Sequence, residues 1–387
     1  MHPMAQYVGL DVSLEETKAC VVDETGQTLW RGCCASTPDE IEKLVCKHAP
    51  NAMRVGLETG MLSVWLFHEL KKRRVPIICI DARHAKAALS LQINKTDAND
   101  AQGIAQVVRV GWYRQVLVKS MDTYAIRAMI SARAQLVSTA LKIKNTVRGL
   151  LKTFGLILKI GSQRRYIQIA RSAIQDNPVL LTIVEPMLIA LGTLQEQIAV
   201  FDRALCRRAS ADPIAKRLMT APGVGVIVAL SYIGTVEDPH RFKRSRTVAA
   251  YLGLTPRRFQ SGETDRAGAI SRAGDPAMRT LLYEAACVVL RRCSRPSPLQ
   301  EWGRALIERL GSKRAMVAVA RKLAVILHHM WRDGTPFQWG TAPRSPNRYK
   351  QRGDPLSAMA VRGPCRDERR RRAIPPAAAE MQAALGT

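Results

Sequence analysis

The sequence predicts an α/β domain, followed by a helical coiled-coil segment and a mostly α-helical domain. Strand-like and helix-like runs alternate over residues 7 to about 110, which is typical of a mixed sheet flanked by helices. Apolar residues then recur at helical spacing as far as residue 208, and a compact, mostly helical pattern follows. We therefore expect an α/β domain at 1–121, coiled-coil helices at 122–210, a helical domain at 211–339 and a basic, disordered tail at 340–387.

The α/β domain is expected to begin with strands. The run "YVGLDV" (7–12) is an apolar strand that contains one acid, and "TKACVVDETGQTLWRG" (17–32) predicts two strands joined by a turn at 24–26. The run "MRVGLETG" (53–60) predicts a further strand that ends in an acid. The remaining expected elements are a helix from Leu62 to Arg73, a buried strand in "VPIICID" (75–81), a second helix from Ala82, and a helix from Thr96 and Asp97 to about Arg109.

A long apolar stripe marks the middle segment, with basic residues on the other helical faces. The stripe consists of Ile126, Ile130, Val137, Leu141, Val147 and Leu151. A second helix, from about Val179 to Arg208, is expected to fold back on the first. Basic helical pairs of this kind often serve dimers or nucleic acid. We therefore expect a homo-oligomer, either a dimer or a tetramer.

The charge balance points to a polyanionic partner. The 387 residues include 59 Lys and Arg against 32 Asp and Glu, a formal net charge of +27. Nucleic acid is the expected partner, and an anionic membrane surface is the weaker alternative. The apolar run "VLLTIVEPMLIALGTL" (179–194) is interrupted by Glu185 and Pro186, so no membrane span is expected.

The cysteines and the N-terminal residues indicate a cytoplasmic protein. The nine cysteines include no C-x-x-C pair, which favours reduced thiols and argues against a zinc module. The first residues lead directly into a strand-like run without the apolar core of a signal peptide. Neither a Walker lysine loop nor an H-E-x-x-H motif is present.

Four acids form the candidate metal site. Asp11 lies inside an apolar strand, Glu58 ends a second strand, and Asp97 and Asp100 stand one helical turn apart at the start of a helix. A carboxylate inside an apolar strand is costly unless it is paired or binds a metal. Four carboxylates at one edge of the sheet would suit Mg²⁺ or Mn²⁺, which prefer oxygen ligands.

Each acid also has a purely structural interpretation. Asp11 can cap the turn that follows it, and Glu58 can be an exposed loop acid before Gly60. Asp97 is a suitable helix N-cap, and Asp100 then lies in the first turn, where the helix dipole favours negative charge. The metal interpretation is favoured when the four are taken together, because a buried strand acid has no simple structural explanation.

A serine in the C-terminal domain is the candidate nucleophile. Ser261 and Gly262 lie in the loop "TPRRFQSGETDRAG" (255–268), among Arg257, Arg258 and Arg266. A hydroxyl among guanidinium groups can attack a phosphodiester while the arginines neutralise the developing charge. The alternative is a turn serine in a phosphate-binding loop, because no histidine lies nearby to act as a base. Ser271 in "ISRAG" is the rival serine.

Two further features are candidates for nucleic-acid binding. The turn "APGVG" places Gly223 and Gly225 between helical stretches, where backbone N–H groups can bind a phosphate. An ordinary interhelical turn explains the same residues equally well. Arg272, beside Ser271, completes the set of arginines expected to contact nucleic acid.

These segments together resemble one family, the DEDD-type transposases of the insertion-sequence "one-ten" family. The resemblance extends from about Tyr7 to Phe337. It is carried by "YVGLDVS", "LETG", "NKTDANDAQGIA", "APGVG", "AYLGLTPRRFQSGE" and "SRAGDPAMRTLLY". The order and the spacing of these motifs are specific to the family, whereas the middle region and the residues after Gly340 carry little identifiable motif.

The resemblance implies a fold and a chemistry. It implies an N-terminal RuvC-like, RNase-H-type domain with the acids Asp11, Glu58, Asp97 and Asp100 around Mg²⁺. It also implies a coiled-coil segment and a C-terminal transposase domain. Its nucleophilic serine follows "TPRR" and precedes glycine, which selects Ser261 over Ser271. The implied partners are donor and target double-stranded DNA and a guide (bridge) non-coding RNA.

Two other functions remain open on the residues alone. A metal-dependent junction nuclease of the RuvC kind would need the four acids but would not need Ser261. A non-catalytic regulator that binds DNA or RNA would need only the basic faces.

Overall fold

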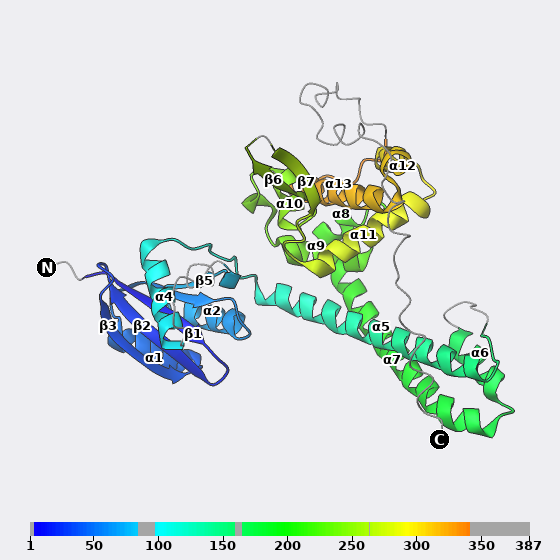
Figure 1. Cartoon of the computed structure of the whole chain (residues 1–387), viewed down its shortest axis with the longest axis horizontal. Coiled ribbons are helices and arrows are strands. Elements are labelled where there is room, and N and C mark those ends of the chain that lie inside the picture. The colour runs from blue at the N-terminus through cyan, green and yellow to red at the C-terminus, as the bar shows by residue number, and fades with distance from the viewer. Residues whose placement is uncertain (1–3, 84–96, 159–164, 263, 341–387) are drawn as a thin grey trace, which may run out of the picture. The chain divides into compact units, whose positions relative to one another are not determined.

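The structure, a computed structural model, describes residues 4–83, 97–158, 165–262 and 264–340, with the backbone alone for 97–98. The chain divides into two compact units, one up to Tyr124 and one from Ala125 (Figure 1). This division falls close to the first predicted boundary, and the finer division into four segments stays a prediction. The helix expected from Ala82 and the basic tail lie largely or wholly outside the described residues.

A five-stranded mixed sheet forms the N-terminal unit, in the order β3-β2-β1-β4-β5 (Figure 1). β1 is antiparallel to β2, and β2 to β3, whereas β1 and β4, and β4 and β5, are parallel. The strands are β1 (Gln6–Val12), β2 (Glu16–Asp23), β3 (Thr28–Ala35), β4 (Ala52–Glu58) and β5 (Ile77–Ile80). The predicted strands and the mixed sheet are therefore confirmed.

The β2–β3 turn lies where the sequence predicts it. The Asp23 carboxylate accepts the backbone N–H groups of Thr25 and Gln27, both at 2.9 Å. Gly26 adopts a φ of 92°, a left-handed conformation that glycine reaches at little cost. The hairpin is thus closed by local hydrogen bonds.

Two helices cover one face of the sheet. α1 (Pro38–His48) is an addition to the expected elements, although Thr37 Oγ1 accepts the Glu40 N–H and Pro38 occupies the first turn, both of which favour a helix start. α2 (Ser63–Lys72) confirms a predicted helix. The buried strand residues packed with these helices are Val8, Leu10, Val55 and Leu57.

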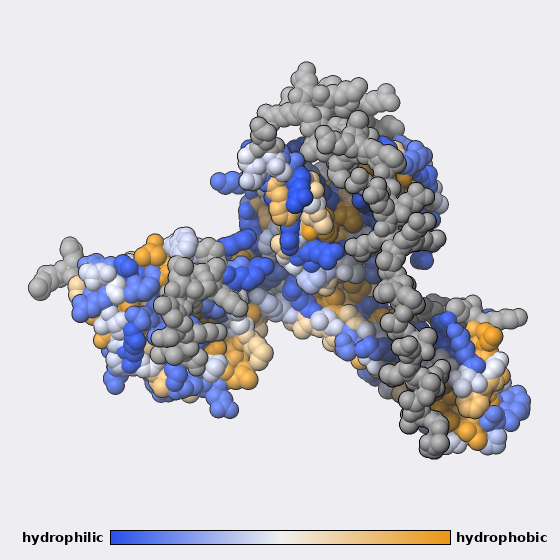
Figure 2. All heavy atoms as spheres, viewed as in Figure 1, coloured by the Kyte–Doolittle hydropathy of each residue, from blue (hydrophilic) through white to orange (hydrophobic). Residues whose placement is uncertain are grey.

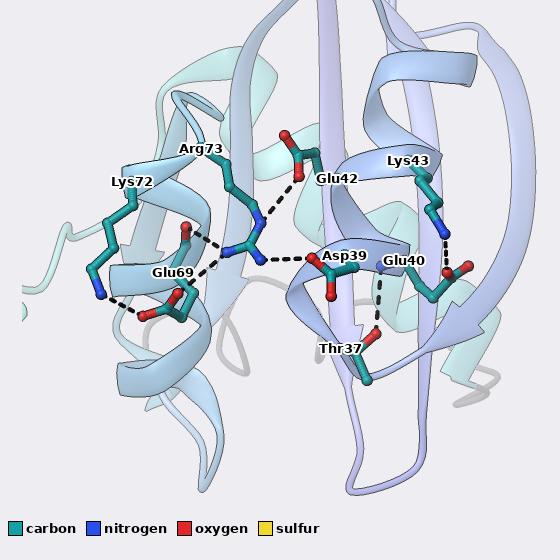
Figure 3. Close-up of polar contacts among 8 residues, drawn as sticks. All are labelled: Thr37, Asp39, Glu40, Glu42, Lys43, Glu69, Lys72 and Arg73. Carbon is teal, nitrogen blue, oxygen red and sulfur yellow. Dashed lines mark hydrogen bonds and ion pairs between the residues drawn. The ribbon is translucent and has the colours of Figure 1, made fainter.

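Arg73, just after α2, connects these two helices (Figure 3). Its guanidinium lies 2.6 Å from the Asp39 carboxylate and 3.1 Å from that of Glu42, both on α1. It also reaches Glu69 of α2 at 3.3 Å. Because Arg73 is shared among three acids, the network holds α1 against α2 more firmly than a single exposed pair would.

α4 (Asp97–Val110) covers the opposite face and confirms the helix predicted there. Near its start, Ala101 packs directly on Gly9 of β1. Near its end, Gln106 Nε2 donates to the Gly26 carbonyl at 2.6 Å, and Gly26 lies in the β2–β3 turn, beside the first residues of β1. α4 therefore runs antiparallel to β1, and its first turn lies toward the carboxyl end of that strand.

Two long helices and a short one form the middle segment, α5 (Met121–Thr153), α6 (Tyr166–Ile174) and α7 (Pro178–Ala211). α5 and α7 are antiparallel, because Arg133 pairs with Asp202 at 2.5 Å whereas Val147 and Leu151 pack near Val184. The predicted helix and its returning partner are confirmed. Coiled-coil packing stays a prediction.

The apolar stripe of α5 contacts two cores and is exposed between them. Ile126 and Ile130 pack against the large C-terminal core, and Val147 and Leu151 are fully buried with α6 and α7. Between these contacts Leu141 is 56% exposed and Val137 is 39% exposed. Figure 2 shows hydrophobic residues at the surface of this helical segment.

α7 is long and apolar enough, by length and composition alone, to cross a membrane. The helix runs continuously through Glu185 and Pro186, the two residues expected to interrupt its apolar run. Glu185 is paired with Arg171 of α6 at 2.6 Å, and buried residues of α7 such as Leu188 pack into the α5–α6–α7 core. A single helix of this kind is weak evidence for a membrane span, and these contacts hold part of α7 within the helical segment.

The rest of the C-terminal unit is mostly helical, as predicted, and packs around one core. Within the described residues, its helices are α8 (Pro213–Leu218), α9 (Val226–Val236), the short 3-10 helix η2 (Pro239–Arg241), α10 (Ser245–Tyr251), α11 (Pro276–Arg291), α12 (Pro298–Leu310) and α13 (Ser312–Arg332). α13 contacts α8, α10, α11 and α12 and is the central helix of the domain.

The stretch expected to be a loop around Ser261 is instead a two-stranded β-hairpin. β6 (Pro256–Ser261) pairs antiparallel with β7 (Thr264–Ile270). Every described residue of the two strands is exposed except Ile270, which is half-buried. A strand that is exposed on both faces lacks the alternating apolar pattern by which strands are recognised, so the sequence pattern does not reveal this hairpin.

Candidate active site

The sheet places two of the predicted acids side by side. In the parallel pairing of β1 with β4, Leu10 lies opposite Leu57, and Asp11 and Glu58 follow them. Alternation along the strands puts both acids on the face that carries Gly9 and Gly56, the face that α4 covers. Both acids are half-buried. The expected meeting of Asp11 and Glu58 at one edge of the sheet thus follows from the strand register.

The first turn of α4 brings the third acid to the same edge. A Cβ built on Gly9 would lie 2.1 Å from the Ala101 carbonyl oxygen, so the helix backbone rests directly on β1. Asp100 precedes Ala101 and lies toward the carboxyl end of β1, where Asp11 lies. Only a glycine at position 9 allows this approach.

The chemistry of the acids suits a hard divalent cation, because carboxylate oxygens are the ligands such ions prefer. The side chain of Asp97 lies outside what the structure describes. Among the described side chains, no group of three or more His, Cys, Asp or Glu residues is close enough to hold a metal ion. Asp11, Glu58 and Asp100 therefore do not complete a metal site in the described arrangement, and a four-acid site requires Asp97.

A fifth acid lies close to this edge and is absent from the sequence-based set. Asp81 follows β5, next to Glu58 on β4, and the signal for it is the acid that ends "VPIICID". Arg83 donates to both of its oxygens, at 3.0 to 3.3 Å. The side-chain hydrogen bond from Arg83 is the main reason why the pKa of the Asp81 carboxyl lies below its ordinary value. Because Asp81 is already paired with Arg83, it serves as a control for substitutions of the other acids.

The second candidate site is the tip of the β6–β7 hairpin. Ser261 is the last residue of β6 and pairs with Thr264, and Gly262 in the turn has a φ of 53°. The Ser261 side chain is exposed to solvent. An exposed hydroxyl at the end of a narrow ribbon can approach an extended strand of nucleic acid.

The arginines of the hairpin are divided between its two faces. Arg266 pairs with Phe259 across the ribbon, on the face that carries Ser261, and its guanidinium lies 5.6 Å from the centre of the Phe259 ring. Arg258 lies on the opposite face and forms a bidentate pair with Asp265. Arg266 is therefore the hairpin arginine best placed to assist Ser261.

The base of the hairpin is held by two interlocking glycine turns. A Cβ on Gly253 would lie 2.0 Å from the Ala273 carbonyl oxygen, and one on Gly274 would lie 2.2 Å from that of Tyr251. Both glycines have positive φ angles, 69° and 80°. This close packing joins the "YLGL" and "SRAGD" segments, so the motifs on either side of the hairpin form one structural unit.

Ser271, the rival serine, lies at this base. Its backbone N–H donates to the Thr255 carbonyl at 2.8 Å, and its own carbonyl accepts from Arg257 Nη2 at 3.3 Å. Arg272 follows it with a φ of 55°, an uncommon conformation for a residue other than glycine. Ser271 and Arg257 thus stabilise the base of the ribbon, away from its tip.

The "APGVG" turn connects α8 to α9. Gly223 packs against α11, because a Cβ there would lie 2.4 Å from the Ala285 carbonyl oxygen. Gly225 is the N-cap of α9, and a Cβ there would meet nothing within 4 Å. Packing explains the glycine at 223, whereas the open space at 225 leaves the α9 N-terminus accessible.

Arg127 and Asp275 form an ion pair that the motif analysis overlooks. Arg127 Nη2 of α5 lies 2.9 Å from Asp275 Oδ2, and Asp275 also caps α11 through the N–H groups of Ala277 and Met278. Burial opposes ionisation of Asp275, but these hydrogen bonds and Arg127 outweigh it and lower the pKa of the carboxyl. The pair connects the long helix to the segment that follows Arg272.

Comparison with known proteins identifies the family of the chain. Residues 8–155 match a DEDD transposase family of the IS110 type, and residues 215–301 match the family described as "Transposase IS116/IS110/IS902 family". The first match contains the four acids, and the second contains Gly223 and Ser261. A "Probable family 20 transposase" of Pseudomonas aeruginosa is 32% identical over 240 residues, which cover 60% of this chain and 71% of that protein.

The chain belongs to the IS116/IS110/IS902 transposase family. The transposase is also 29% identical to the "Transposase for insertion sequence element IS1111A" of Coxiella burnetii over 329 residues, 83% of this chain and 88% of that protein. A "Pilin gene-inverting protein" of Moraxella lacunata is 27% identical over 125 residues, 32% of this chain and 38% of its own. The transposase is thus an enzyme of DNA cleavage and rejoining with a DEDD-type nuclease-like domain.

Proposed function

We propose that this transposase is an RNA-guided DNA recombinase of a mobile element, which cuts and rejoins DNA through a covalent serine–DNA intermediate. The observation that carries the proposal is the exposed Ser261 at the tip of a ribbon that presents Arg266 on the same face. Family membership supports DNA as the substrate.

The acids Asp11, Glu58, Asp97 and Asp100 are proposed to bind Mg²⁺ or Mn²⁺. The strand register, in which Asp11 and Glu58 directly follow the Leu10–Leu57 pair, and the contact between Gly9 and Ala101 support this set. A divalent cation, when bound, would neutralise phosphate charge and lower the pKa of an attacking hydroxyl. The carboxylates would hold the cation from two strands and one helix.

Ser261 is proposed to attack the scissile phosphorus. In this step a bond forms between Ser261 Oγ and phosphorus, the bond from phosphorus to one deoxyribose oxygen breaks, and the serine proton passes to a base. The departing oxygen takes up a proton, and the reverse reaction with another strand rejoins the DNA. The hairpin contains no histidine, so this base comes from outside the hairpin. Arg266 neutralises charge as it develops on the phosphate.

The remaining partners follow from charge and from the helical segment. The net charge of +27 supports binding of both donor and target DNA and of a guide RNA. The exposed apolar residues Val137 and Leu141 support an oligomer formed through α5. We place the protein in the cytoplasm, associated with the nucleoid, and propose no membrane partner.

A covalent adduct tests the proposal directly. The protein is incubated with its flanking non-coding RNA and a nicked suicide DNA substrate, and the adduct is mapped by mass spectrometry. We expect the adduct on Ser261, no adduct and no cleavage in Ser261→Ala, and retained adduct in the matched Ser271→Ala. Ser261→Cys keeps a nucleophile of different size and pKa, so reduced activity is expected.

The alternatives predict other results. Efficient cleavage by Ser261→Ala, without any adduct, would identify a metal-dependent junction nuclease. Binding without cleavage by the unaltered protein would identify a regulator. Recombination of donor and target plasmids that proceeds equally well without the flanking RNA would overturn guidance by RNA.

A further inference from the structure

A cavity of about 310 Å³ lies at the base of the β6–β7 hairpin. Its apolar lining comes from three separate segments, because Leu254 precedes β6, Ile270 ends β7, and Val317 and Ala320 belong to α13. A volume of about 300 Å³ is at the lower end of the range for sites that bind small organic groups. The cavity therefore suits one compact, mostly apolar group.

Planar polar side chains lie beside this apolar lining. Arg272 is exposed and Tyr283 is half-buried, and both line the cavity. Tyr283 and the guanidinium of Arg272 present flat surfaces on which a nucleobase can stack. Thr280, which also lines the cavity, donates its hydroxyl proton to the Pro276 carbonyl and keeps its oxygen as an acceptor.

The cavity wall is fixed by backbone contacts. Arg279 Nη1 donates to the carbonyls of Leu252, Ala273 and Gly274, at 3.3, 2.9 and 3.1 Å. The Arg272 N–H donates to the Gly253 carbonyl at 3.1 Å, and this bond holds Arg272 in its left-handed conformation. A non-glycine residue held at positive φ at the edge of a cavity is the kind of strain that surrounding structure maintains at binding sites.

The lining identifies the class of ligand. A phosphate could meet Arg272 at the rim, but Arg279 is bound to backbone carbonyls. Inside the cavity the charge of an anion would lie against the apolar lining of Leu254, Ile270, Val317 and Ala320, which is unfavourable. A nucleobase has two apolar faces and a polar edge, which match the apolar lining and the polar rim. Arg266, exposed on β7, is positioned to bind the backbone of the strand to which that base belongs.

We propose that this cavity receives one unstacked nucleobase of a DNA strand bound along the β6–β7 hairpin. The proposal rests on the proposed function in that the hairpin is taken to bind DNA. From the Pro256–Ile270 pair to the Ser261–Thr264 pair, β6 advances by five residues, or roughly 17 Å at about 3.4 Å per residue. The base is therefore several nucleotides from the phosphate at Ser261, and the cavity anchors the strand without touching the reacting atoms.

Fluorescence of single-stranded DNA tests this placement. A series of oligonucleotides carries 2-aminopurine at one position each, and each is bound to Ser261→Ala protein, which keeps the strand uncut. We expect one position to change its fluorescence on binding. Val317→Phe, which fills the cavity, should abolish that change and weaken binding by about tenfold to a hundredfold. The matched control is Ala318→Phe on the next residue of α13, which should leave both unchanged.

An abasic nucleotide at the responsive position separates base binding from phosphate binding. It should weaken binding to the Ser261→Ala protein as much as Val317→Phe does, and the two changes together should cost no more than either alone. Equal binding of the abasic and intact strands, or equal effects of Val317→Phe and Ala318→Phe, would overturn the proposal. Should Val317→Phe unfold the domain, Tyr283→Ala supplies the second variant, judged by the same abasic comparison.

The outcomes also distinguish this inference from the proposed chemistry. An adduct on Ser261 without any responsive base would exclude base binding in the cavity and support the serine mechanism. A fluorescence change that Val317→Phe abolishes, in a protein that forms no adduct, would support base binding in the cavity and exclude the serine mechanism. The same series in RNA identifies the source of the base, and a response in RNA alone would overturn the assignment to DNA.

Discussion

Gly9 of β1 and Ala101 of α4 are in direct backbone contact. A Cβ built on Gly9 would lie 2.1 Å from the Ala101 carbonyl oxygen and 2.4 Å from the Ala105 nitrogen. Asp11 follows Gly9 by two residues on the same face of the sheet, and Asp100 immediately precedes Ala101. The distance between the strand acid and the helix acid is thus set by the absence of a side chain at position 9.

Gly9→Ala should separate α4 from the sheet and disable the acid site. The new methyl group meets main-chain atoms, which cannot rotate away, so we expect a loss of about 2 kcal/mol or more in the free energy of unfolding. Thermal unfolding and DNA cleavage measure the two effects. The control is Gly60→Ala, where a Cβ meets nothing within 4 Å. Equal unfolding temperatures for the two variants would contradict this account of the α4–β1 contact.

Removal of charge from any one of the four acids should abolish cleavage. In Asp11→Asn, Glu58→Gln, Asp97→Asn and Asp100→Asn we expect at least about a hundredfold loss, because each removes a proposed ligand for the divalent cation. Asp81→Asn is the matched control, since Asp81 lies close to the same edge and is already paired with Arg83. Cleavage assays across a Mg²⁺ titration measure the effect. Full activity in two of the four variants would contradict the assignment of these acids to a metal site.

Asp265→Asn should strengthen binding of nucleic acid. Arg258 is now neutralised by Asp265, and the variant releases its guanidinium to contact a phosphate. The dependence of log affinity on log salt should steepen by about one. Asp333→Asn is the control, because Asp333 is also exposed and paired with an arginine, Arg332, but lies at the end of α13. An unchanged salt dependence in Asp265→Asn would show that Arg258 does not contact nucleic acid.

Buried His328 should make the C-terminal unit less stable in acid. His328 Nδ1 lies 2.9 Å from Ser245 Oγ and Nε2 lies 2.9 Å from the Pro239 carbonyl oxygen, and the ring is fully buried. Burial lowers the pKa of His328 below its ordinary 6.5, and nearby Arg332 and His329 lower it further, whereas the Pro239 carbonyl and Asp333 raise it. Below pH 6.5 the unfolded chain binds this proton more readily than the folded one, so stability falls with pH.

This loss of stability should disappear in a variant that cannot titrate. Stability is lost progressively as the pH falls from 6.5 to the lowered pKa of His328, with a slope of at most about 1.4 kcal/mol per pH unit. Above this range the stability is fully retained. Chemical denaturation of His328→Gln at several pH values should show a smaller pH dependence than the unaltered protein. His329→Gln, on an exposed neighbour, is the control. Identical pH dependence in all three proteins would exclude His328 as the cause.

Leu141→Asp should dissociate the proposed oligomer without unfolding the chain. Leu141 is 56% exposed, so a carboxylate there is solvated in the monomer but would be buried against a second copy. Sedimentation measures the oligomeric state. Gln135→Asp, at an exposed position about 120° around α5 from Leu141, is the control for added charge. Val147→Asp, at a fully buried position, should instead unfold the helical segment. An oligomer unaffected by Leu141→Asp would exclude this surface.

The sequence alone determined the strands of the N-terminal unit and the positions of the acids. The strands of 7–12 and 53–60 are apolar runs bounded by turns, and each carries its acid near its end, so strand assignment also predicts which edge of the sheet the acids share. The start of α1 at Thr37 is likewise a local signal, present in the sequence and overlooked. Local signals of this kind depend on residues a few positions apart, which is why one chain suffices to recognise them.

Tertiary structure decided the features that depend on distant residues. Val137 and Val147 belong to one apolar stripe with one helical period, yet Val137 is exposed and Val147 is buried, because α6 and α7 cover only part of α5. The β6–β7 hairpin is solvated on both faces, so its pattern carries no hydrophobic alternation, and backbone pairing alone defines it. The cavity at its base is lined by residues of α13 as well as by the hairpin. Such contacts join positions far apart in the chain, so the hydrophobic periodicity of a short stretch of sequence cannot predict them.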